Sequence, residues 1–396
     1  MRRLLFALAL LAAWPTVARA DDITLRGNYY RDRNTRVVQP EADLTKTFST
    51  GTVIGAHYLL DTITSASVAA GVLRDQPFTE LRNEAGFSLG QHVGPALLSA
   101  SYTYSSESDY WAHTAAISGT VDLFHHNTTL GLALAWGHDQ VAQRMGPTNY
   151  APLGGLDSVH LIAGVTQLLS PTALVNLSYD LDVVGFGNKT NGYQGNPYRT
   201  VNLGGSPSRE SVPFQRFRQS VAVSGNVMVP LGSKLVPYIA FRPSYRFYWD
   251  DWSIYSQTPE LRIFIPVGPV ELRVTGRYYT QTAASFWSNV PGDDTPTYTV
   301  DAFHNLNDPQ GKACTACYSS SANKQLFYTA DPKLSAFDTM YTEIQLRIRL
   351  RGLERLSRWL SEGLVEISYG HLFNDAYAHQ AFGDAELAGL TLIFPL

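Results

Sequence analysis

Residues 385–396, AELAGLTLIFPL, decide the fold that we expect of this chain. Side chains alternate between the two faces of a strand, and one face here carries Leu390, Leu392, Phe394 and Leu396. An amphipathic strand that ends a chain must pair with another strand or leave an exposed edge. In an outer-membrane barrel the last strand pairs with the first, so no edge remains. The ending therefore predicts a closed, antiparallel transmembrane β-barrel.

Pro395 limits where this closure can be strong, because proline has no backbone N–H to donate. We expect residues 390–394 to carry the pairing. The last two residues should then contribute mainly apolar contact at the inner rim.

Residues 1–20 have the three parts of a secretory signal peptide. Arg2 and Arg3 form a positive n-region, 4–14 is an apolar run, and 18–20 is an A-x-A cleavage site. The apolar run is too short to span a bilayer as a helix. We therefore expect export, cleavage after Ala20 and a barrel domain formed by residues 21–396.

Composition narrows the class of protein. Without Arg2, Arg3 and Arg19, the formal charge of −4 falls to about −7, which argues against a nucleic-acid binder. Beyond the signal, no apolar run reaches the length of a transmembrane helix. The chain is rich in aromatic residues, and its mean hydropathy is −0.11. A soluble secreted β-protein could share this composition, and so could a barrel whose lipid-facing and lumen-facing residues average out.

About 16 strand-like segments follow one another, a number within the range of outer-membrane barrels. They lie at 23–33, 36–48, 52–62, 78–91, 96–106, 110–124, 128–140, 157–169, 173–186, 213–230, 235–249, 252–266, 270–283, 337–350, 363–373 and 385–396. Short turns containing Gly, Pro, Asn or Ser alternate with longer connections, the longest being 141–156, 187–211 and 284–324. This asymmetry is typical of short periplasmic turns on one rim and long extracellular loops on the other.

One short-turn join departs from the pattern. In 352–362, Leu353, Leu356, Trp359 and Leu360 recur at helical spacing. The spacing predicts a short amphipathic helix at the inner rim. The alternative is a connecting helix with no further role.

Charged residues indicate which strand face turns inward. An arginine that faces lipid at the midplane costs roughly 2–4 kcal/mol, so the charged faces should line the lumen. The predicted lumen-lining residues are Arg242, Arg246, Arg273, Arg277, Arg347, Arg349, Glu271 and Glu343. The same reasoning places Arg216, Arg218, Glu260, Arg262 and Glu366 inside.

The first half of the barrel offers a different wall. Segment 110–124 presents mostly small residues inward, and Arg26 could lie near Glu41 and Asp43. Opposed charges across a water-filled lumen resemble the transverse field of a porin constriction. The alternative is that neighbouring Arg and Glu residues simply pair and stiffen the wall. Both interpretations predict a polar interior.

Cys314 and Cys317 form the single cysteine motif. Tyr318 excludes a C-x-x-C-H haem site, and a four-cysteine zinc site lacks partners. In an oxidising compartment we expect a local disulfide that staples the long loop. A metal site with His304 is the alternative.

Catalytic motifs are missing from the sequence. We find no G-x-S-x-G, H-E-x-x-H or Walker loop. We therefore expect no enzyme activity, no catalytic or metal-binding residues and no cofactor.

Three runs carry a resemblance to a known family. ITLRGNYYRDRNTRVVQP (23–40), HYLLDTITSAS (57–67) and FYTADPKLSAFDT (327–339) resemble the bacterial family catalogued as domain of unknown function 3570. The resemblance covers most of the mature chain. It implies an outer-membrane barrel and supplies no catalytic residues, because the family has no established activity.

Together these patterns predict a barrel in the outer membrane of a Gram-negative bacterium. We expect it to contact outer-membrane lipid and to be inserted by the barrel-assembly machinery. Its expected task is passage or transport of a small solute, and the arginines favour an anion over a cation. Two alternatives stay open. A non-conducting barrel would scaffold a periplasmic or surface partner, such as an electron-transfer protein, and a barrel enzyme would have a rim active site.

Overall fold

The computed structural model describes residues 21–396 with gaps. The gaps are 34, 66–77, 145–149, 187–199, 204–205, 210–211, 214, 288–297, 301–305, 308–324, 328, 330, 356, 377 and 379–382. The predicted signal peptide and the predicted disulfide between Cys314 and Cys317 lie outside the described residues, as does His304. In the part of the chain that is described, no helix has the length and apolarity needed to cross a membrane.

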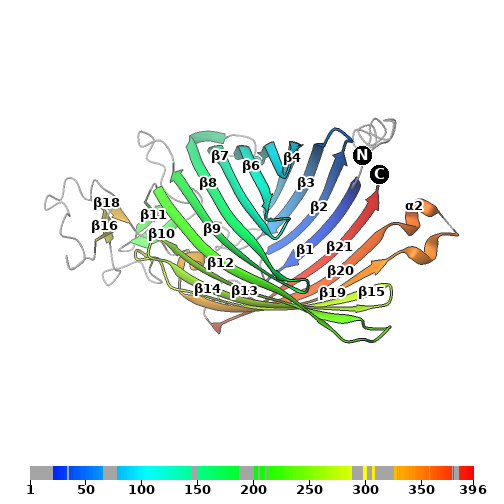
Figure 1. Ribbon diagram of the computed structural model, residues 1–396. Helices are drawn as coiled ribbons and strands as arrows, with labels where there is room; N and C mark the ends of the chain where they lie inside the picture. The colour runs from blue at the N-terminus through cyan, green and yellow to red at the C-terminus, as the bar shows by residue number, and fades with distance from the viewer. Residues whose placement is uncertain are drawn as a thin grey trace.

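Sixteen antiparallel strands close into one barrel, which confirms the predicted fold class (Figure 1). In barrel order they are β1 (Asp22–Arg31), β2 (Thr35–Thr47), β3 (Thr52–Ser65), β4 (Phe78–Val93), β5 (Ala96–Ser106), β6 (Tyr110–Leu123), β7 (Thr128–Arg144), β8 (Tyr150–Ser170), β9 (Ala173–Phe186), β12 (Gln215–Pro230), β13 (Tyr238–Asp250), β14 (Tyr255–Val267), β15 (Val270–Gln281), β19 (Phe337–Arg349), β20 (Leu364–Asn374) and β21 (Ala385–Pro395). Successive strands of the barrel pair with one another, so most of the sheet consists of antiparallel hairpins.

Closure joins β1 to β21 over their full lengths. The register runs from Asp22 opposite Pro395 to Arg31 opposite Glu386. Leu396 N also donates to Asp21 O at 3.1 Å. The prediction that residues 390–394 carry closure was therefore too narrow, because the pairing extends from Glu386 to Pro395. Pro395 has no N–H to donate, but it keeps its carbonyl.

That carbonyl is used by the short-turn connection between β19 and β20. Trp359 Nε1 donates to Pro395 O at 2.7 Å, and the Trp359 ring stacks on Phe394 with centroids 4.5 Å apart. The predicted helix over 352–362 is two separate turns, η4 (Arg351–Leu353) and α2 (Arg358–Ser361). The connection thus clamps the closing strand at its end.

The two rims differ as the sequence predicts. We call the end with the β2–β3, β4–β5 and β14–β15 turns the short-turn rim; α2, the start of β1 and the end of β21 lie there (Figure 1). The opposite end is the long-loop rim. Two small sheets occur in its connections and were not predicted. They are β10 (Thr200–Leu203) with β11 (Ser206–Arg209), and β16 (Tyr298–Val300) between β17 (Leu306–Asn307) and β18 (Gln325–Phe327).

The connection predicted at 141–156 is much shorter in the structure. β7 continues to Arg144 and β8 begins at Tyr150. The register moves from Val141 opposite Gly154 to Ala142 opposite Pro152, which leaves one extra residue on β8. A β-bulge of this kind lets a strand accommodate proline and a glycine with φ of 152°.

The strand faces differ in chemistry. Large apolar side chains are exposed at alternate positions on one face; Ile117 is 62% and Ile344 57% exposed. Phe87, Leu98, Leu132, Val223 and Ile367 lie on this same face. Such a continuous exposed apolar band is typical of a lipid-facing surface. The other face is polar, and in a closed barrel it turns inward.

Candidate functional site

The eight arginine and glutamate residues predicted to line the lumen all lie on the polar face. Strand register shows this directly, since Glu271 is opposite Arg347 and Arg273 is opposite Gln345. On the next strands, Arg242 lies directly opposite Arg262. We call this surface of β12–β15 and β19 the arginine wall.

Five arginines of the arginine wall lie over aromatic rings, and three of them are Arg242, Arg246 and Arg277. The guanidinium carbon of Arg242 lies 5.1 Å from the centroid of Phe264, and that of Arg277 lies 4.9 Å from Tyr341. Arg246 lies 6.0 Å from Tyr248. Among the described residues, none of the three forms an ion pair with a carboxylate. Ring stacking fixes the direction of these guanidinium groups without using their N–H donors, and Glu260 lies opposite Arg277 in the strand register.

The rest of the wall is an ion-pair network. Arg273 Nε contacts Glu271 Oε1 at 2.6 Å, and Arg273 Nη1 lies 3.4 Å from Glu366 Oε1. Arg347 Nε lies 3.0 Å from that same Glu366 oxygen. Glu343 instead accepts from Thr275 Oγ1 at 3.4 Å, and Arg349 is exposed at the end of β19. This part of the wall agrees with the interpretation that neighbouring Arg and Glu residues pair.

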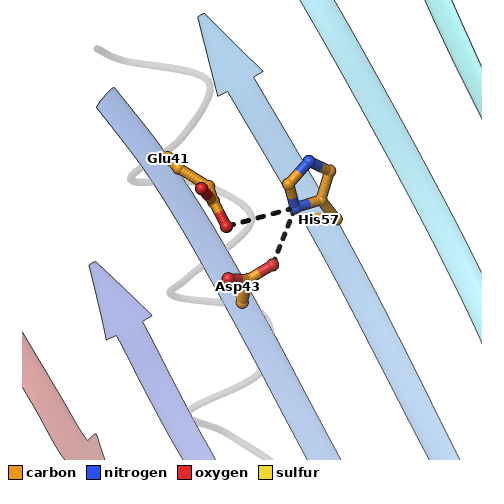
Figure 2. Close-up of side chains that lie close together, drawn as sticks. All are labelled: Glu41, Asp43 and His57. Carbon is orange, nitrogen blue, oxygen red and sulfur yellow. Dashed lines mark hydrogen bonds and ion pairs between the residues drawn. The ribbon is translucent and has the colours of Figure 1, made fainter. Parts of the chain in front are cut away.

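A second charged cluster lies on β1–β4. Arg26 Nη1 contacts both Glu41 and Asp43, the latter at 2.7 Å, which confirms the predicted proximity. His57 Nδ1 lies 2.7 Å from Asp43 Oδ1 and 4.0 Å from Glu41 Oε1 (Figure 2). On its other side, His57 Nε2 is 3.5 Å from Glu84 Oε1. We call Arg26, Glu41, Asp43, His57 and Glu84 the acidic cluster.

Sequence reasoning missed His57 and Glu84 as members of this cluster. Their membership depends on register: His57 is directly opposite Asp43 on β2 and Gly86 on β4. Alternation alone places His57 on the same face as Asp61, but it cannot say which residue of the next strand it meets. A register assumed from the short 48–51 turn could have found it.

Strand order sets the two charged surfaces across the lumen from each other. In the circuit of sixteen strands, β2, β3 and β4 stand eight places from β12, β13 and β14. Between them, β5–β7 present small residues on the polar face, such as Thr103 opposite Thr114. The small residues of β5–β7 thus separate the two charged surfaces on one side of the barrel.

The long-loop rim contains a buried polar centre that the sequence did not reveal. Asp250 Oδ2 accepts from Arg216 Nε at 2.9 Å and from Tyr248 OH at 2.7 Å, and its side chain has no exposed surface. Arg216 also lies over the Trp252 ring, 4.3 Å from its centroid. Trp252 packs in an apolar cluster with Val212, Ile254, Ala284 and Phe286. This rim cluster ties three connections together above the arginine wall.

The neighbouring turn residue, Asp251, has an altered acidity. Its Oδ1 accepts from Phe217 N at 3.0 Å. Desolvation by the surrounding protein is the main effect and raises the pKa of Asp251 to about 6.

Comparisons with known proteins agree with the fold. A family model described as Protein of unknown function (DUF3570) matches residues 69–361. No curated protein sequence matches the chain. A solved bacterial polysaccharide outer membrane secretin matches with a TM-score of 0.52 at 8% identity, covering 96% of this chain and 100% of that one. CdiB from Acinetobacter baumannii matches with a TM-score of 0.51 at 9% identity, covering 96% of this chain and 60% of that one. At this identity the likeness establishes an outer-membrane β-barrel fold.

Proposed function

The chain belongs to the family described as Protein of unknown function (DUF3570), and we propose that its barrel is an outer-membrane channel for small solutes that favours anions over cations. One observation carries the preference: Arg242, Arg246 and Arg277 have no carboxylate partner among the described residues. The likeness to outer-membrane barrels supports the location, and the polar inward face supports a water-filled lumen.

The electrostatic effect of these arginines can be estimated. A unit charge at 4 Å contributes about 1 kcal/mol in water, which concentrates an anion about fivefold beside each exposed guanidinium. Low-dielectric walls focus the field and strengthen this effect. The acidic cluster opposes it, but Glu41 and Asp43 already contact Arg26. The preference for anions is therefore the net effect of the three arginines without an ion pair, Arg242, Arg246 and Arg277, against a partly neutralised acidic cluster.

The arrangement also supports a second property of the lumen. A positive wall facing a negative one produces a field across the direction of passage. A solute with its own dipole would turn in that field, so shape and charge separation should both influence its passage. We propose that the predicted lumen residues, including Glu271 and Glu343, tune this field.

Purified, folded protein in a planar bilayer tests the proposal. We expect stepwise single-channel currents. The triple variant Arg242→Gln/Arg246→Gln/Arg277→Gln should conduct but lose most of its anion preference. Lys234→Gln, in the exposed β12–β13 turn, removes a positive charge outside the lumen and should leave selectivity unchanged.

The outcomes separate the function classes. No current from folded protein would defeat the channel and favour a scaffold for a periplasmic or surface partner. Equal selectivity in the triple variant and Lys234→Gln would defeat the role of the arginines while the channel stands. Activity that depends on a rim histidine or serine would instead favour a barrel enzyme.

Three further proposals concern the chain before and after insertion. We propose that residues 1–20 are cleaved as a signal peptide, and that the barrel-assembly machinery inserts the mature chain. We also propose that Cys314 and Cys317 form a local disulfide. Mass spectrometry of protein from outer membranes, with and without reduction, tests both the cleavage and the disulfide.

A further inference from the structure

We propose that Glu41, Asp43 and His57 form a binding site for a divalent transition-metal ion in the wall of the lumen. The evidence for this site does not rest on conduction. Glu41 and Asp43 lie on β2 and His57 lies on β3, all on the polar face (Figure 2).

The donor atoms are already close enough to share an ion. Among the described residues, this is the one group of three His, Cys, Asp or Glu side chains whose donor atoms all lie within 4.8 Å of one another. His57 Nδ1 is 2.7 Å from Asp43 Oδ1 and 4.0 Å from Glu41 Oε1. A bound ion at metal–ligand distances near 2.1 Å would need only small side-chain movements.

The backbone fixes this arrangement. Glu41 and Asp43 are two residues apart on β2, so they share a face, and β-pairing sets His57 directly opposite Asp43. All three side chains are partly buried, with 14%, 26% and 29% of their surface exposed. Ligands held on paired strands are more precisely placed than ligands on loops.

The positively charged side chain of Arg26 already contacts two of the three proposed ligands. One nitrogen of Arg26, Nη1, contacts a carboxylate oxygen of both Glu41 and Asp43. The Arg26 side chain is 41% exposed and is therefore able to swing into the lumen. A single guanidinium faces three carboxylates here, because Glu84 lies beside His57 as well. A divalent ion would neutralise Glu41 and Asp43 and displace Arg26.

Glycine leaves room around the imidazole. Gly86, opposite His57 on β4, has no side chain, and a Cβ there would lie 3.4 Å from His57 Cβ and 3.2 Å from Thr103 Oγ1. Gly86 therefore places no side chain against His57 on β4.

The donor set selects the class of ion. One imidazole nitrogen with two carboxylate oxygens suits first-row divalent ions such as Zn²⁺, Co²⁺ or Mn²⁺. Ca²⁺ and Mg²⁺ prefer sets composed of oxygen alone. Other histidines of the described chain contact fewer carboxylates, and His160, which lies 3.0 Å from Asp180, serves as a matched comparison.

Co²⁺ binding to the folded full-length mature chain without a histidine tag tests the site. Visible absorption and calorimetry should show one saturable ion per barrel, which Zn²⁺ displaces. His57→Ala and Glu41→Gln should abolish it, and His160→Ala should leave it unchanged. Arg26→Gln should bind Co²⁺ about tenfold tighter, since it removes a competing positive charge.

The test is decisive because the variants should change the Co²⁺ affinity in opposite directions. If Arg26→Gln binds more weakly than the wild type, the cluster is an ion-pair network and the proposal fails. It also fails if His160→Ala abolishes binding, or if Mg²⁺ competes as well as Zn²⁺ does. Heat-modified gel mobility confirms that each variant is folded. Because no current is measured, failure here leaves the proposed channel untouched.

Discussion

Replacing Asp250 with alanine should destabilise the folded barrel by about 3–5 kcal/mol, the range expected when one partner of a buried ion pair is removed. Its carboxylate accepts from Arg216 at 2.9 and 2.6 Å and from Tyr248 at 2.7 Å. It also accepts from the backbone N–H groups of Trp252 and Ile254, at 3.0 and 2.8 Å. Alanine leaves the Arg216 charge, only 12% exposed, without its carboxylate, and it leaves two backbone donors unsatisfied.

Urea unfolding in detergent micelles, followed by tryptophan fluorescence, measures the loss. Asp157→Ala is the control, because Asp157 is 67% exposed where it pairs with His138. That change should cost less than about 1 kcal/mol. If Asp250→Ala and Asp157→Ala shift the unfolding midpoint equally, the buried carboxylate does not hold the rim. A double-mutant cycle of Asp250→Ala with Arg216→Met then assigns the coupling energy to this pair.

Three further predictions concern the rims. His125→Gly should raise the unfolding free energy by about 1 kcal/mol, since His125 has φ of 59° and glycine tolerates the left-handed region without strain; an unchanged urea midpoint would contradict this. Trp359→Ala should lower it by about 1–2 kcal/mol through loss of the hydrogen bond to Pro395 and of ring contact, whereas Trp359→Phe should recover only the stacking part; equal loss in both would show that stacking contributes little. Asp251, whose pKa is raised to about 6, binds its proton more tightly when folded, so stability should fall as pH rises from about 4 to 6. Asp251→Asn should flatten that slope in urea titrations, and an unchanged slope would assign it to another group.

Much of the barrel follows from two regularities of the sequence. Alternation along strands such as 128–140 gives the faces, and the alternation of short and long joins gives the order of hairpins. Since most barrel strands pair with the strand that follows them in the chain, these local patterns suffice for much of the topology. The amphipathic ending predicted the pairing of β21 with β1, which closes the barrel.

The parts that were not predicted depend on details that local pattern does not contain. Pro152 and Gly154 indicated a loop, but a bulge keeps them inside β8. Helical spacing at 352–362 predicted one helix, whereas the structure has two short turns. The first difference arises because β7 supplies backbone partners that override local preference.

The charged surfaces show the same limit. The sequence placed Arg242 and Arg277 on the polar face, because a charged side chain is unfavourable on the lipid-facing surface. Which arginines would pair with carboxylates depended on register and side-chain direction, so the unpaired three could not be separated from Arg273 and Arg347. The acidic cluster needed the exact pairing of β2 with β3.

The reversal potential of single channels under a KCl gradient tests the central claim most directly. We predict a potential displaced toward the chloride equilibrium value for the wild type, and a shift toward the potassium value in the triple variant Arg242→Gln/Arg246→Gln/Arg277→Gln. A wild-type potential at the potassium side, unchanged in that variant, would contradict the claim that unpaired arginines set the selectivity of this barrel.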